Sequence, residues 1–284
     1  MGEVNATALR SPAWHAAGWV LGAASVLAAL SISACAPRQT PIATTTTPAQ
    51  PTLRVGIAPN YPPLAFKQNG HITGVEAQFA KLLGPALAMH TVLVETPWDD
   101  LIPALRDRRI DIIMSGMSVT EQRQQLVSFA HPYLRVGQMM LLRRADAKRL
   151  RDDKAINQQT TRIGFVTGTT GEQYVRQHFQ RAQLKGFESV DAAVVALRAR
   201  QIDVFVHDAP SIYGVMAGTD KPERELIGRY EPLTEEYLAW AVRKDDEALR
   251  ARLDGILAKW NADGTLDSVL SKWIKVQRKP AQTK

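Results

Sequence analysis

A cluster of small polar residues and an arginine follows the apolar run "IDII" near the middle of the chain. Ser115, Gly116, Ser118 and Thr120 come directly after this run, and Arg123 lies three residues beyond Thr120. Hydroxyls, backbone N–H groups and a guanidinium are hydrogen-bond donors, and an arginine binds a carboxylate through two parallel hydrogen bonds. The cluster therefore indicates an anion site, although an arginine on an exposed helix would give the same pattern.

A second polar turn, "TGTTG" at 167–171, follows the apolar run 162–166 and precedes a predicted helix. Thr169 and Thr170 supply hydroxyls, and the first N–H groups of a helix attract an anion. Asp208 follows another apolar run, 203–207, and supplies a negative charge. An ordinary capped turn at 167–171, and an aspartate that caps the next helix, are the alternatives without a ligand.

Two aromatic residues complete this set of candidates. Tyr61 lies in "PNYPPLAF" after the run 53–57, and Trp98 follows the run 90–96. Both would serve equally well as core residues. The chain has no GxGxxG, Walker or HExxH motif and no paired cysteine and histidine set, so we expect neither a cofactor nor a metal ion.

The segments around these polar groups alternate between strand-like and helix-like patterns. The predicted strands are 53–57, 90–96, 110–114, 162–166, 203–207 and 237–242, and the predicted helices are 74–88, 101–109, 171–182, 190–200, 245–260 and 265–274. This order predicts an α/β protein with two lobes. Small ligands bind between lobes and beyond the carboxyl ends of strands, where the polar groups fall.

The composition is that of a globular protein with room for one or two domains. The 284 residues are 45% hydrophobic and 22% charged, and the formal net charge is +7. A nucleic-acid site would need a basic stripe, but the basic residues alternate with acids, as in "RKDDEALRAR". We interpret the charge as a solvated basic surface and expect no nucleic-acid partner.

The N-terminal segment has the features of an export signal. Residues 16–34 are uncharged and mostly apolar, and "ISAC" ends in Cys35, the single cysteine of the chain. This sequence resembles the lipobox of bacterial lipoproteins, so we expect a signal peptide at 1–34 and a lipidated Cys35 that anchors the protein to a membrane. An uncleaved anchor with an unmodified Cys35 is the alternative. Residues 35–52, rich in threonine and proline, predict a tether.

From about Leu53 to Lys275 the chain resembles family 3 of the bacterial extracellular solute-binding proteins, the polar amino-acid receptors of ABC importers. The resemblance rests on "YPPLAF", "WDDLIPALRDRRIDIIMSGMSVTEQR", "FAHPYL", "VTGTTGEQYV", "IDVFVHDAP" and "WNADGTLDSVLSKW", in family order.

The resemblance implies a type II periplasmic-binding-protein-like fold, with two hinge strands and the ligand in the cleft between two lobes. The hinges are expected near 138–143 and 237–242. Lobe 1 would comprise residues 53–140 and 238–284, and lobe 2 residues 141–237.

The resemblance also implies roles for individual residues. Arg123 would bind the α-carboxylate of an amino acid, Asp208 its α-ammonium, and Trp98 would lie along its side chain. Further residues would assist at the carboxylate, line the pocket or sit in the same wall: Ser118, Gly116, Thr170, Ser115, Thr169 and Tyr61.

Two sequence departures bear on the ligand. Relatives for basic ligands carry an acid three residues before the tyrosine, where this chain has Ala58. His207–Asp208 matches the glutamine-receptor form of that motif, although His207 would also serve in packing. We therefore expect glutamine or another neutral polar amino acid rather than lysine or arginine.

The expected function is that of an exported, monomeric receptor that delivers its ligand to an ABC transporter permease. One alternative is a cyclohexadienyl or prephenate dehydratase-like enzyme on the same scaffold, with Glu172 beside the anion loop as a general acid. A sensory module is a third possibility, but no signalling domain is attached.

Overall fold

The structure is a computed structural model that describes residues 50–217, 225–229 and 231–274. The expected signal peptide, Cys35 and nearly all of the tether lie outside the described residues. Within the described part of the chain, no helix is both long and apolar enough to cross a lipid bilayer.

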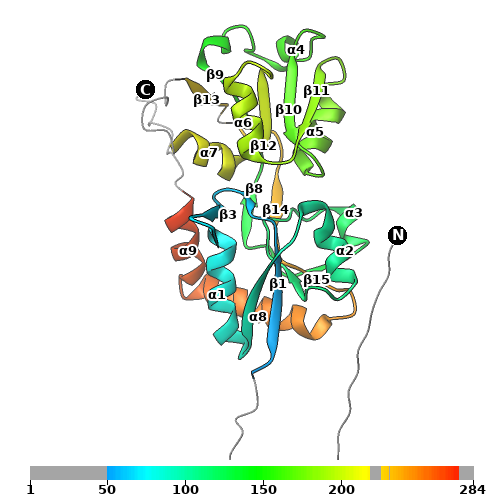
Figure 1. Ribbon diagram of the computed structural model, residues 1–284, viewed down its shortest axis with the longest axis vertical. Helices are drawn as coiled ribbons and strands as arrows, with labels where there is room; N and C mark the ends of the chain where they lie inside the picture. Colours follow the sequence, from blue (N-terminus) through cyan, green and yellow to red (C-terminus); the bar gives the residue numbers. More distant parts are fainter. Residues whose placement is uncertain (1–49, 218–224, 230, 275–284) are drawn as a thin grey trace, which may run out of the picture. The chain divides into compact units, whose positions relative to one another are not determined.

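The first lobe is built on a five-stranded sheet with helices packed against it (Figure 1). The strand order is β5 (His90–Glu95), β1 (Thr52–Ile57), β6 (Ile112–Ile113), β15 (Ala241–Val242) and β7 (Ser128–Phe129). Its helices are α1 (Val75–Leu87), α2 (Leu101–Arg106), α3 (Glu121–Gln124), α8 (Glu247–Ala262) and α9 (Thr265–Trp273). β1 runs parallel to β5 and β6, whereas β15 returns antiparallel from the far end of the chain.

Aromatic residues from distant parts of the sequence fill the core of this lobe. Phe79 of α1 packs against Trp240 and Trp260 at ring-centroid distances of 5.6 and 5.8 Å. Each large aromatic side chain removes much apolar surface from water. The C-terminal helices are therefore integral to the first lobe, even though the second lobe precedes them in sequence.

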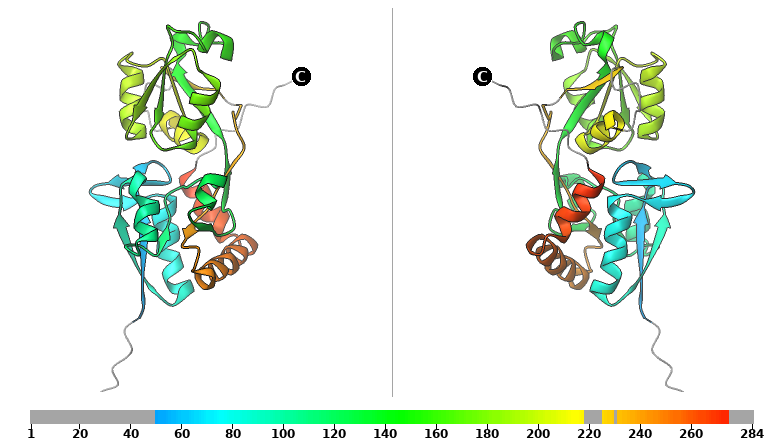
Figure 2. Two further views of the ribbon diagram at one scale, coloured as in Figure 1. Left: turned by 90° about the vertical axis from the view of Figure 1, so that its right-hand side faces the viewer. Right: turned by 90° about the vertical axis from the view of Figure 1, so that its left-hand side faces the viewer.

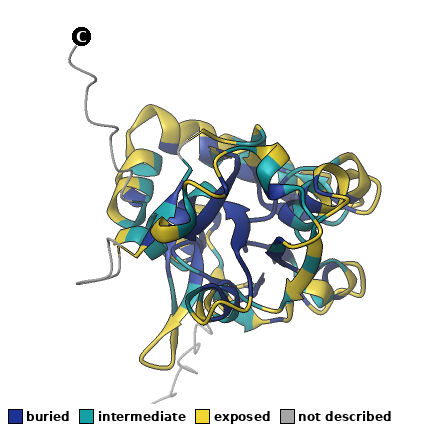
Figure 3. Cartoon of the chain, turned by 90° about the horizontal axis from the view of Figure 1, so that it is seen from above, coloured by how far each residue is buried: buried dark blue, intermediate teal, exposed yellow. Residues whose placement is uncertain are grey.

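The second lobe has a similar sheet, in the order β11 (Gln183–Phe187), β10 (Arg162–Val166), β12 (Val204–Asp208), β9 (Gln138–Arg143) and β13 (Leu226–Gly228). Its helices are α4 (Asp153–Ile156), α5 (Thr170–His178), α6 (Val190–Arg198) and α7 (Ala209–Ala217). In the view from above, buried strands lie at the centre and helices with exposed faces surround them (Figure 3).

Two short strands connect the lobes, namely β8 (Leu134–Val136) and β14 (Glu236–Leu238). They pair antiparallel, and the side views show both crossings along the same side of the molecule (Figure 2). The hinge expected at 138–143 is instead β9, a strand of the second sheet that starts three residues before the expected start of lobe 2. All six residues of β9 are buried, because neighbouring strands and helices cover both of its faces.

Each predicted helix and strand has a counterpart in the structure, although the predicted strand 237–242 is divided between β14 and β15. β11, with the sequence "QLKGF", was not predicted because it is an edge strand whose residues are mostly exposed and polar. Asp100 precedes α2, but its side chain makes no cap hydrogen bond. Its carboxylate instead accepts hydrogen bonds from Arg109 at 2.9 and 2.8 Å.

Candidate functional site

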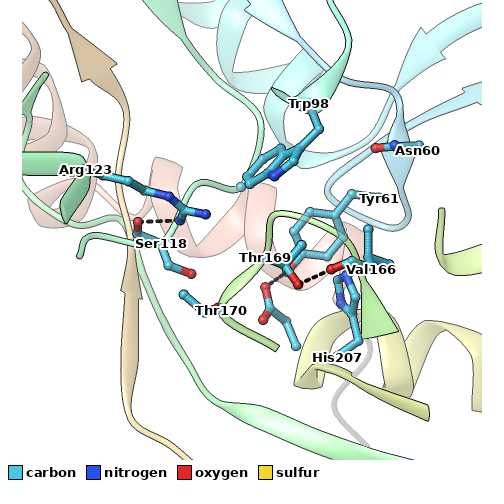
Figure 4. Close-up of a pocket in the computed structure, with 11 residues that line it drawn as sticks. Asn60, Tyr61, Trp98, Ser118, Arg123, Val166, Thr169, Thr170 and His207 are labelled. Atoms are coloured by element: carbon cyan, nitrogen blue, oxygen red, sulfur yellow. Dashed lines mark hydrogen bonds between the residues drawn. The ribbon is translucent and has the colours of Figure 1, made fainter. Parts of the chain in front are cut away.

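A cavity between the two lobes brings together residues from seven separate segments (Figure 4). Its lining consists of Asn60, Tyr61, Trp98, Gly116, Ser118, Arg123, Val166, Thr169, Thr170, His207 and Asp208. The lobes contribute comparable shares of this wall. Eight of the nine residues expected from the sequence are among them, and only Ser115 is not.

Arg123 lies in the short helix α3, which Thr120 caps by accepting the Arg123 backbone N–H. The guanidinium donates to the carbonyl oxygens of Ser118 at 2.8 Å and Gly168 at 3.2 Å. It also lies 5.3 Å from the ring centroid of Trp98. A guanidinium has five N–H donors, so donors remain for a ligand.

Burial dominates the electrostatics of Arg123, whose residue surface is only 9% exposed. Burial lowers the pKa of Arg123, whereas the nearby carboxylates of Asp208 and Glu236 act to raise it. An arginine begins from so high a pKa that it stays cationic in proteins. The cavity therefore contains a permanent positive charge with little solvent around it.

Asp208 ends β12 on the opposite lobe, and its carboxylate is also buried. It accepts hydrogen bonds from the Tyr61 hydroxyl and from the side-chain amide of Gln138. Burial, and after it the charge of Glu236, raise the pKa of Asp208 to about 7, against the opposing effects of Tyr61, Gln138 and Arg123.

The aromatic residues are held by specific contacts. Trp98 donates its indole N–H to the carbonyl of Gly168 on the other lobe at 3.1 Å. Tyr61 packs edge-on against His207, with ring centroids 4.9 Å apart. Both side chains therefore line the cavity and touch the opposite lobe.

The profile of the bacterial extracellular solute-binding proteins, family 3, matches residues 53–276. The chain belongs to this family. The L-cystine-binding protein TcyJ of Escherichia coli (strain K12) is a 26% identical relative, and the alignment covers 78% of this chain and 82% of that protein.

Solved structures of similar proteins show the same fold. The ancestral amino acid-binding protein AncCDT-1, a precursor of cyclohexadienyl dehydratase, is 32% identical with a TM-score of 0.73, over 79% of this chain and 96% of that one. An ancestral arginine-binding protein bound to glutamine is 27% identical with a TM-score of 0.72, over 79% of this chain and 98% of that one. The type II periplasmic-binding-protein fold is thereby confirmed for this family 3 protein.

Two polar groups that were expected to bind an anion instead make hydrogen bonds within the fold of this family 3 protein. Ser115 is buried outside the cavity lining, and its hydroxyl accepts the Ala58 N–H at 3.0 Å. Gly116 lines the cavity, but its N–H donates to the buried Glu76 carboxylate at 2.6 Å. That N–H therefore does not point to a ligand. Sequence patterns could not show this, because Glu76 comes from a helix forty residues earlier.

The hydroxyls of the 167–171 turn are also engaged. Thr169 donates to the Val166 carbonyl at 2.7 Å and caps α5 by accepting the Glu172 N–H. The Thr170 hydroxyl accepts from the Gln138 amide at 3.1 Å. Both side chains line the cavity, so this turn caps helix α5 and also forms part of the candidate site.

Glu172, the general acid in the enzyme alternative, does not line the cavity. Its carboxylate accepts the Gly168 N–H at 2.8 Å and pairs with Arg176 at 2.8 Å. These contacts order the turn that precedes α5. Among the described residues, no group of three acidic, histidine or cysteine side chains is placed to hold a metal ion.

Sequence analysis did not identify several residues at this site. Asn60 and Val166 line the cavity, and Asn60 donates to the Glu188 carbonyl of the other lobe at 3.0 Å. Gln138 and Glu236 lie behind Asp208. The glutamine that opens the apolar strand "QMMLLR" was a usable signal, because a fully buried polar side chain needs partners.

His207 has two roles that the sequence could not separate. It packs against Tyr61 and Phe205, as expected for a core residue, and it also lines the cavity. Burial lowers the pKa of His207 to about 3, so the imidazole is neutral at physiological pH. Its Nδ1 has no hydrogen-bond partner among the described residues.

Proposed function

We propose that this protein is the extracytoplasmic receptor of an ABC importer, which binds a polar amino acid and delivers it to a membrane permease. One observation carries the proposal. Arg123 of the first lobe and Asp208 of the second line the same cavity and present opposite charges. An amino acid is a zwitterion whose two charged ends match this pair.

In this proposal Arg123 binds the α-carboxylate, with help from Ser118 and the backbone at Thr170, and Asp208 binds the α-ammonium, whereas the N–H of Gly116 serves the fold. Trp98 and Tyr61 form the wall along the ligand side chain, and Thr169 contributes to the lining. The geometry supports these roles because the two charged groups are buried and lie on different lobes. Ser115 acts indirectly, by holding the backbone at Ala58.

The side-chain end of the ligand is the less constrained part. Asp208 is the sole acid among the described residues that line the cavity, and the position that would supply a second acid is Ala58, which is buried outside that lining. A ligand ammonium or guanidinium would be left without a partner, at a considerable cost. Asn60 and the neutral His207 instead offer hydrogen bonds, so we propose glutamine or another neutral polar amino acid.

Isothermal titration calorimetry with each common amino acid tests this function. We expect a neutral polar amino acid to bind at least about tenfold more tightly than lysine or arginine, a difference of about 1.4 kcal/mol. Tight arginine binding would overturn the side-chain assignment but keep the receptor function. Absence of binding by every amino acid would overturn the function itself.

The location of the protein is also part of the proposal. The apolar segment 16–34 and Cys35 favour a signal peptide and a lipid anchor, with residues 35–52 as a tether. The folded part would then act as a monomer at the periplasmic or outer face of a membrane, close to its permease.

A further inference from the structure

The buried surroundings of Asp208 contain a second carboxylate. Glu236 lies on β14, one of the two strands that connect the lobes. Its Oε1 accepts hydrogen bonds from the Gln138 amide at 3.1 Å and from the Thr234 hydroxyl at 2.7 Å. Its Oε2 is buried and has no hydrogen-bond partner among the described residues.

Gln138 joins the two carboxylates. Its side chain is fully buried, and its single amide nitrogen contacts the Asp208 carboxylate, the Glu236 carboxylate and the Thr170 hydroxyl. An amide nitrogen carries two hydrogens and cannot supply all three acceptors fully. The cluster therefore lacks donors for its acceptors.

Two ionised carboxylates at such close quarters repel each other, because burial weakens solvent screening. A single proton on the pair relieves the repulsion and supplies a missing donor. The ammonium group of an amino acid does the same, with three N–H donors and a positive charge.

On the basis of the proposed function, we propose that Gln138 and Glu236 complete the ammonium subsite. In the ligand-free cavity the Asp208–Glu236 pair holds one proton, and the ligand ammonium takes its place, so that binding releases this proton to solvent. Glu236 is then a specificity-determining acid of the subsite, and Gln138 is a positioning residue that holds both carboxylates.

The other groups around Asp208 are consistent with a proton on the pair. Among the described residues, Arg123 is the one cation that acts on Asp208, and its guanidinium is held by two backbone carbonyls. Tyr61 donates to Asp208, and the pKa values of Tyr61 and Tyr133 are raised, so both phenols are neutral. His207 is neutral as well. Burial and the charge of Glu236 therefore raise the pKa of Asp208 to about 7, and the single guanidinium of Arg123 only partly offsets them.

The direction of the pH effect follows from this proton. The ligand ammonium prefers the ionised pair, so affinity is full well above pH 7 and decreases as the pH falls through about 7. With a ligand-free pKa of about 7, binding should be about tenfold weaker at pH 6 than at pH 8. Calorimetry in buffers of different ionisation enthalpy should detect release of nearly one proton at pH 6 and little release at pH 8.

Glu236→Gln removes one charge but keeps the side-chain shape. Using L-glutamine as the titrated ligand, we expect the pH-dependent step of this variant to move to lower pH and so to shrink between pH 6 and 8, because Asp208 is no longer repelled by a second carboxylate although it stays buried. Glu235→Gln is the matched control, since the exposed Glu235 contacts Tyr237 and Arg135 instead. Unchanged pH dependence in Glu236→Gln would overturn the inference.

A second measurement needs no ligand. Carbon-13 NMR of the side-chain carboxyl groups, recorded from pH 4 to 9, should show a carboxyl that titrates near pH 7 in the ligand-free protein. The signal should be absent in Asp208→Asn and should move to lower pH in Glu236→Gln. If no carboxyl titrates above about pH 6, the inference fails even if amino acids bind. If the signal is present but no amino acid binds, the proposed function fails instead.

Discussion

Arg123 and Asp208 are both buried and line the same cavity. Each carries a charge that a zwitterionic ligand would balance. The contacts that hold them are mostly with the backbone or with neutral side chains. Their charged groups are therefore available to bind a ligand. In a structural ion pair such as Arg143 and Asp203, by contrast, the guanidinium nitrogen and the carboxylate oxygen lie 2.9 Å apart and neutralise each other.

At the residue scale, Arg123→Ala and Asp208→Ala should each nearly abolish amino-acid binding while the fold survives. Removing one partner of a buried charge pair costs roughly 2–5 kcal/mol, which is about 30-fold to several-thousand-fold in affinity. Calorimetry measures the loss, and circular dichroism verifies the fold. Arg151→Ala, at an exposed position outside the cavity, is the control. A variant that retains affinity within about threefold would remove that residue from the proposed role.

At the scale of elements, the connection between the lobes depends on close backbone contact. Gly137 lies between β8 and β9, and a Cβ atom there would approach the Thr234 carbonyl oxygen to 2.1 Å. The two crossing segments are therefore packed backbone against backbone. A side chain at Gly137 must push them apart.

Gly137→Ala should accordingly lower the free energy of unfolding by about 1–3 kcal/mol, the usual cost of forced overpacking. Gly255→Ala is the matched control in helix α8, where a Cβ atom meets nothing within 4 Å. It should be neutral or stabilise by up to about 1 kcal/mol, because alanine favours a helix. Urea denaturation of both variants tests the difference, and equal stability would contradict the close packing at the connection.

At the scale of the whole molecule, a ligand that contacts both lobes should favour a closed arrangement about β8 and β14. A ligand shifts a conformational equilibrium only through its different affinity for the two states. Small-angle X-ray scattering should show a smaller radius of gyration with saturating amino acid than without it. Arg123→Ala under the same conditions should show no change. Identical scattering curves for the wild type in both conditions would argue against closure by the ligand.

The attachment of the chain to a membrane is a second prediction at this scale. Radiolabelled palmitate should enter the wild-type protein in bacterial cells and should not enter Cys35→Ala, because Cys35 is the single cysteine of the chain. Equal labelling of the two proteins would show that the lipobox-like sequence is not used.

The sequence by itself determined the family, the two-lobed α/β fold and most of the cavity lining. Each of these depends on local patterns: alternating apolar runs predict strands and helices, and short motifs such as "SGMSVTEQR" and "TGTTG" follow the ends of strands. The polar groups near the carboxyl ends of strands indicated a site, and the family resemblance assigned the roles of Arg123, Asp208 and Trp98.

Only the tertiary structure decided which polar groups face the cavity and which serve the fold. Ser115 and the Gly116 N–H were expected to face a ligand, but they bond to Ala58 and Glu76. The strands that connect the lobes lie at 134–136 and 236–238. The segment 138–143, which was expected to be a hinge, is instead buried in the second sheet as β9. Gln138 and Glu236 meet Asp208 only after the chain has folded, since 98 residues separate the first two in sequence. Such long-range contacts depend on packing between elements, which local sequence patterns do not encode.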